Sequence, residues 1–130
     1  MTRLTRARER FVTETDMELM LGTWINFEKD FIGIVRAELT CSRDGVLHLA
    51  ATAEPDHARW DAVPAAVFSE DVAQRRGAAL VASFTLADRS VGVVGYQARG
   101  ILTLETATTF TDGSGRSPHY IRQHFYRLPT

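Results

Sequence analysis

The amino-acid sequence predicts an all-β protein, in which eight antiparallel strands close into a small up-and-down barrel behind a short N-terminal helical segment. Short apolar or alternating runs, separated by turn residues, recur along the 130 residues, a spacing typical of sandwiches and barrels. No periodic segment of helix length lies between the runs, which argues against a parallel sheet with crossover helices. A chain of this length suits one domain with one core.

The N-terminal part is expected to be a tail followed by one or two helical turns. Residues 1–10 form the solvated, arginine-rich tail, and residues 11–130 form the single barrel domain. Within Thr13–Leu21, either Thr13 or Thr15 can act as an N-cap, and acidic residues follow in the first turn. A short helix is therefore expected over this segment.

The strands are expected where apolar or alternating runs lie between turn signals. Asp44-Gly45 predicts a hairpin turn, because glycine tolerates positive φ. Pro55–Pro64 is expected to be a long loop, Glu70–Gly77 a loop or helical turn, and Asp112–Arg116 a hairpin loop. The expected strands are Gly22–Glu28, Gly33–Ser42, Val46–Glu54, Ala66–Ser69, Ala78–Leu86, Val91–Ala98, Ile101–Thr111 and His119–Leu128.

Composition excludes several classes of protein. A formal net charge of −1 predicts no general attraction to nucleic acid or to anionic lipid. The single cysteine, Cys41, excludes an internal disulfide and a cysteine-based zinc site. No run approaches the roughly 20 apolar residues that span a bilayer, and no apolar stretch follows the basic N-terminus. We therefore expect a cytoplasmic protein with neither a nucleic-acid nor a membrane partner.

The segment Gly22-Thr23-Trp24-Ile25-Asn26 resembles the first strand of calycins, the group of lipocalins, fatty-acid-binding proteins and avidins. In calycins this Trp packs at the closed end of the barrel, and an Arg from the last strand lies across it. The resemblance implies that Trp24 closes this barrel, with either Arg122 or Arg127 across it. Avidins contact biotin at the position of Asn26, but they line their pocket with several Trp residues. Because the chain has only Trp24 and Trp60, biotin is not expected.

More of the chain is similar to a group of small bacterial lipocalin-like proteins. The similar segments are Gly22–Asn26, Gly33–Glu38, Trp60–Pro64 and Phe110–Ser117. The resemblance implies a fold but no established reaction. The chain departs from the group at Pro55–Arg59, where the relatives carry a segment with Cys and His, so we expect neither a metal nor a thiol role there.

Polar residues that alternate with apolar ones make up the candidate site. The period of two separates two faces on each strand, but a register error of one residue exchanges them. If the charged faces point inward, Arg36, Glu38, Glu105 and Arg122 form a paired cluster inside the barrel. If they point outward, the same residues are a solvated wall. The candidate ligand-binding residues are Trp24, Asn26, Arg36, Glu38, Trp60, Tyr96, Glu105, Tyr120 and Arg122.

Three functions remain open on this sequence. The first is a module that binds a small, mostly apolar organic molecule, with Trp60 either stacking on it or plugging the barrel. The second is a cofactor-independent cyclase or isomerase, in which Glu105 or Glu38 is the catalytic acid or base. The third is a structural or interaction barrel filled by its own side chains. No metal site and no cofactor are expected, and a homodimer stays open.

Overall fold

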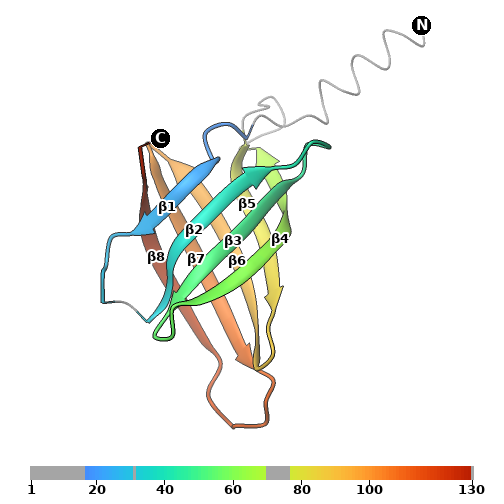
Figure 1. The fold of residues 1–130 in the computed structure, drawn as a ribbon, viewed down its shortest axis with the longest axis vertical. Helices are drawn as coiled ribbons and strands as arrows, with labels where there is room; N and C mark the ends of the chain where they lie inside the picture. The colour runs from blue at the N-terminus through green and yellow to red at the C-terminus, as the bar shows by residue number, and fades with distance from the viewer. Residues whose placement is uncertain (1–16, 31, 70–76, 130) are drawn as a thin grey trace, which may run out of the picture.

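Eight strands pair antiparallel in sequence order, and pairing of the last strand with the first closes the barrel (Figure 1). The computed structural model describes residues 17–30, 32–69 and 77–129. The predicted fold class, an all-β up-and-down barrel of eight strands, is thereby confirmed. The strands are β1 Gly22–Asn26, β2 Gly33–Cys41, β3 Leu47–Glu54, β4 Ala58–Ser69, β5 Gly77–Thr85, β6 Arg89–Ala98, β7 Ile101–Phe110 and β8 His119–Arg127.

The expected loop Pro55–Pro64 is wrong over most of its length, because β4 begins at Ala58. Trp60 pairs with Ala51, whereas Val63 pairs with Leu49, so β4 carries one extra residue between these two pairs. Such a bulge interrupts the alternation of apolar and polar residues that identifies a strand in a sequence. For this reason the sequence pattern does not indicate that a strand begins at Ala58.

Turns rather than a helix precede β1 in the described part of the chain. Of the expected helix Thr13–Leu21, residues 13–16 lie outside the described residues. From Met17 onward the backbone forms hydrogen-bonded turns, with the Met20 amide donating to the Met17 carbonyl at 2.9 Å. The tail 1–10 and most of the expected loop Glu70–Gly77 also lie outside the described residues. No helix in the described ranges is long and apolar enough to cross a membrane.

One end of the barrel is closed by Trp24. Its Nε1 donates to the Met20 carbonyl at 2.9 Å, and the Arg127 guanidinium lies 4.7 Å from the centre of its ring. Arg127 also donates to the Leu19 carbonyl. The arginine that the calycin resemblance places across Trp24 is therefore Arg127, on the last strand. Gly22 has a φ of 129°, which favours glycine, and the Arg127 side chain packs over it.

One face of each strand points into the interior of the barrel. The alternation of buried and more exposed residues along β5 to β7 follows the period of two that a barrel wall imposes. The largest fully buried side chains are Trp24, Phe84, Phe125, Met20, Leu39 and Leu47, with further leucines and valines beside them.

Candidate functional site

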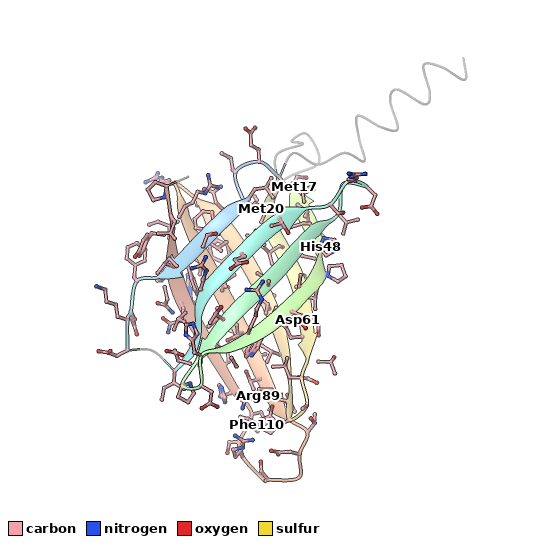
Figure 2. The ribbon with its side chains drawn as sticks, in the orientation of Figure 1. Met17, Met20, His48, Asp61, Arg89 and Phe110 are labelled. Carbon is pink, nitrogen blue, oxygen red and sulfur yellow. The ribbon has the colours of Figure 1, made fainter. Side chains whose placement is uncertain are left out.

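The barrel is hollow at the end opposite Met20. A cavity of about 370 Å³ lies there, where β3 turns into β4 and where β7 leads into β8. Arg89 and Phe110 mark this end in Figure 2, whereas Met17 and Met20 lie at the other end. The buried apolar residues that line the cavity are Ile34, Ala53, Trp60, Val91, Leu104 and Phe125.

Small inward-facing side chains contribute to the space at this end. Eight strands enclose an interior that side chains can just fill when they are large. Near the closed end, Trp24 and Met20 fill the barrel, and both are fully buried. Near the open end the inward positions include Ala53, Thr106 and Thr108, which leave space between opposite walls.

Three polar, uncharged side chains lie on one side of the cavity. Thr106 and Thr108 come from β7, and Gln123 comes from the neighbouring β8. In the register of these strands, Gln123 pairs with Leu104, which is two residues from Thr106 along the same face. Thr106 and Gln123 are therefore diagonal neighbours on the inner wall.

At the mouth of the cavity, Phe110 is held between two arginines. The Arg89 guanidinium lies 4.9 Å from the centre of the Phe110 ring, and the Arg116 guanidinium lies 3.9 Å from it. Arg116 comes from the β7–β8 connection, which extends beyond the barrel at the bottom of Figure 1. These cation–π contacts fasten that connection to the barrel rim.

Two aspartates neutralise the arginines of the mouth. Arg89 donates to both carboxylate oxygens of Asp88, at 3.0 and 2.9 Å. Arg116 Nη2 lies 2.7 Å from Asp112 Oδ2 and 3.5 Å from Asp88 Oδ2. The two positive charges that line the mouth are thus already paired within the protein.

These pairs displace the pKa values of the groups that form them. Hydrogen bonds from Ser114, and then from Arg116, lower the pKa of Asp112 to about 2. The hydrogen bonds from Arg89 lower the pKa of Asp88, and the same contact raises the pKa of Arg89. Each shift has the direction expected when a hydrogen-bonded partner stabilises the charged form.

The opposite side of the mouth is acidic. Glu54 and Asp56 line it from the end of β3 and the turn that follows. Glu54 Oε1 is buried and makes no hydrogen bond, although His57 Nδ1 lies 3.3 Å away without hydrogen-bond geometry. The mouth therefore has one side with the carboxylates of Glu54 and Asp56 and another side where arginines are paired with aspartates.

Of the residues that the sequence nominates, Trp60 lines the cavity. Trp24 and Asn26 are buried but do not line it. The Asn26 amide donates to the Ile34 carbonyl at 3.0 Å, and its oxygen accepts from the Glu28 amide at 2.8 Å. Trp24 therefore closes the far end, and Asn26 shapes the connection between β1 and β2.

The nominated charged residues lie on the outer surface instead of forming a cluster inside the barrel. Because apolar side chains occupy the inner positions, the alternate positions face outward. Their contacts are consistent with this placement: Arg36 Nε lies 3.1 Å from Glu38 Oε1, and Arg122 donates to the Tyr96 hydroxyl at 2.8 Å. The nominated residues with outward-facing side chains are Arg36, Glu38, Tyr96, Glu105, Tyr120 and Arg122, none of which lines the cavity.

The sequence did not nominate the polar residues that line the cavity. Along β7, the period of two separates one face from the other but does not say which face points inward. The face that points inward consists of Leu102, Leu104, Thr106, Thr108 and Phe110. The usable signal is that Leu102, Leu104 and Phe110 make this face the more apolar one, as an inner face should be. Arg89 and Arg116 carry no such signal, because they follow turns.

No group of three or more His, Cys, Asp or Glu side chains converges as a metal site would require within the described part of the chain. The closed antiparallel barrel is compatible with a lipocalin-like fold, and membership of the calycins stays a prediction from the sequence. No protein-family model, no curated protein and no solved structure matches the chain.

Proposed function

We propose that the barrel binds a small, mostly apolar organic molecule in the cavity at its open end. The observation that carries this proposal is the cavity itself, about 370 Å³ in volume and walled by apolar side chains from several strands. This volume lies within the range of roughly 300–1,000 Å³ that is usual for small-molecule pockets. Small-molecule pockets commonly contain a few polar groups that orient the ligand, and polar groups are present at this mouth.

A barrel that serves only as a filled scaffold is less well supported. Its closed end is filled by Trp24 and Met20, but its open end contains space that no side chain occupies. An apolar cavity costs stability, because its lining loses packing contacts. A ligand that occupies the cavity would restore those contacts.

Catalysis within this cavity would require groups other than those nominated from the sequence. Glu38 and Glu105 lie on the outer surface and do not line the cavity. The titratable side chains that line it are found at its mouth, and they include Glu54, Asp56 and His119. Binding is therefore the function that the geometry supports best.

A cavity-filling variant tests the proposal. Ala53 lines the cavity and is 6% exposed, so Ala53→Phe places a ring inside it. The probe is N-phenyl-1-naphthylamine, an uncharged apolar fluorophore, titrated into the wild type and the variant. We expect one-to-one binding to the wild type, and a dissociation constant raised about tenfold or more in Ala53→Phe, equivalent to a loss of about 1.4 kcal/mol.

The matched control is Ala107→Phe, on the outward face of β7, where the alanine is exposed. This control should bind the probe as the wild type does, and circular dichroism should show both variants folded. Equal binding by the wild type and Ala53→Phe would show that the probe does not enter the cavity, and the proposal would then fail.

A further inference from the structure

The threonine and glutamine side chains that line the cavity come from two neighbouring strands, and this distribution carries information about the ligand. Thr106, Thr108 and Gln123 lie on the inner faces of β7 and β8. Ala53 and Trp60 lie on the inner faces of β3 and β4. Around a ring of eight strands, β3 is four strands from β7, and β4 is four strands from β8. Thr106, Thr108 and Gln123 therefore face Ala53 and Trp60 across the cavity.

The three polar side chains have unused hydrogen-bonding capacity. Within the described residues, none of them makes a hydrogen bond to protein. Glu54 Oε1 is a polar atom that is both buried and without a hydrogen-bond partner. The polar atoms of Thr106, Thr108 and Gln123 are not of this kind, because they keep some accessible surface. Their hydroxyl and amide groups therefore open into accessible space, which on this inner face is the cavity.

The opposite wall includes the indole of Trp60. Trp60 is 9% exposed and packs edge-on against Phe84, with 5.2 Å between ring centres. An indole held in this way is a rigid platform for a second ring, because aromatic pairs favour stacked and edge-to-face arrangements. Ala53 beside it leaves room for such a ring.

We infer that the cavity takes a compact, ring-containing molecule that carries hydrogen-bonding oxygens along one edge and hydrocarbon along the other. This inference rests on the proposed binding function. A plain hydrocarbon would leave Thr106, Thr108 and Gln123 without partners, and a buried unsatisfied group is costly. These three side chains are uncharged, and the arginines at the mouth are already paired with Asp88 and Asp112. An uncharged oxygen, such as a carbonyl or hydroxyl, is therefore the matching group.

Two probes of one skeleton test the inference. Fluorene is a hydrocarbon, and 9-fluorenone differs from it by a carbonyl oxygen in place of the methylene hydrogens. Both are titrated into the wild type and into Thr106→Val/Thr108→Val, with quenching of tryptophan fluorescence as the readout. Valine keeps the size and branching of threonine but cannot donate a hydrogen bond. We expect the double variant to weaken binding of 9-fluorenone by roughly five- to tenfold, and not to weaken binding of fluorene.

Thr109→Val is the matched control, because Thr109 is exposed on the outward face of the same strand. It should leave both dissociation constants unchanged. If the double variant changed the two dissociation constants equally, or changed neither, the inference would be overturned while the binding function stood. If the wild type bound neither probe, the inference would be overturned, whereas the binding function would still be decided by the N-phenyl-1-naphthylamine titration.

Discussion

Gly92 and Gly95 lie on opposite faces of one strand, β6, and show how side-chain direction decides the effect of a residue. A Cβ at Gly95 would lie 2.8 Å from Leu104 Cδ2 and 3.2 Å from Leu80 Cγ, inside the packed core. A Cβ at Gly92 would meet nothing within 4 Å. The same residue type is therefore required by packing at one position and not at the other.

We expect Gly95→Ala to lower the free energy of unfolding by roughly 1–3 kcal/mol, because overpacking displaces the neighbouring leucines. Gly92→Ala, its control, should be neutral or slightly stabilising, since alanine loses less backbone freedom on folding. Urea unfolding of both variants and the wild type measures these differences. Equal effects of the two substitutions would contradict the packing of Gly95 against the core.

The contribution of Asp112 to the stability of the protein should depend on pH. Its pKa in the folded protein is about 2, below the ordinary value of 3.8, so the unfolded chain binds more protons between these values. The stability that Asp112 contributes is therefore fully present above about pH 4 and is lost as the pH falls towards 2.

The difference in free energy of unfolding between the wild type and Asp112→Asn should accordingly be largest above pH 4 and shrink towards pH 2. Urea unfolding at several pH values from 5 to 2 measures it. A difference that stayed constant over this range would show that the Asp112 carboxylate has no special role in the β7–β8 connection.

At the scale of elements, the turns before β1 act as a plug for the closed end. Met20 is fully buried beneath the Trp24 and Arg127 pair, and its carbonyl accepts a hydrogen bond from the Trp24 indole. Leu19, its neighbour, is 37% exposed and contributes its carbonyl to Arg127. This short segment therefore belongs to the barrel core even though it is not a strand.

Truncation of the plug tests this role. Met20→Ala should lower the free energy of unfolding by roughly 2–5 kcal/mol, as expected for a large buried side chain. Leu19→Ala should cost much less, because its side chain is partly in water and its carbonyl contact is kept. Thermal or urea unfolding compares the two variants. A similarly small loss in both would mean that the segment does not pack into the barrel as described.

At the scale of the whole molecule, the barrel is filled at one end and hollow at the other. Strand number sets the width of the interior, and side-chain size along each inner face sets how much of that width is filled. Trp24 and Met20 fill one end, whereas Ala53 and Thr106 leave the other open. The cavity is thus a consequence of which side chains point inward at this end, and not of a change in strand number.

Local signals in the sequence predicted the all-β class and placed most strand boundaries within about two residues of those observed. The hairpin at Asp44-Gly45 is an example: Gly45 has a φ of 80°, and its amide donates to the Ser42 carbonyl at 3.0 Å. Such turns depend on residues that are adjacent in the chain, so the sequence displays them directly. The bulge in β4 was missed, because it is defined by pairing with a different strand.

The candidate site depended on information that only the tertiary structure contains. The alternation along β7 separates Glu105 from Thr106, but the closure of the barrel decides which of them meets water and which meets the cavity. Likewise, Arg127 rather than Arg122 reaches Trp24, because pairing of β8 with β1 places Arg127 opposite it. The period of two sorts residues into faces without naming the inner one, since that is fixed by contacts between strands far apart in the chain.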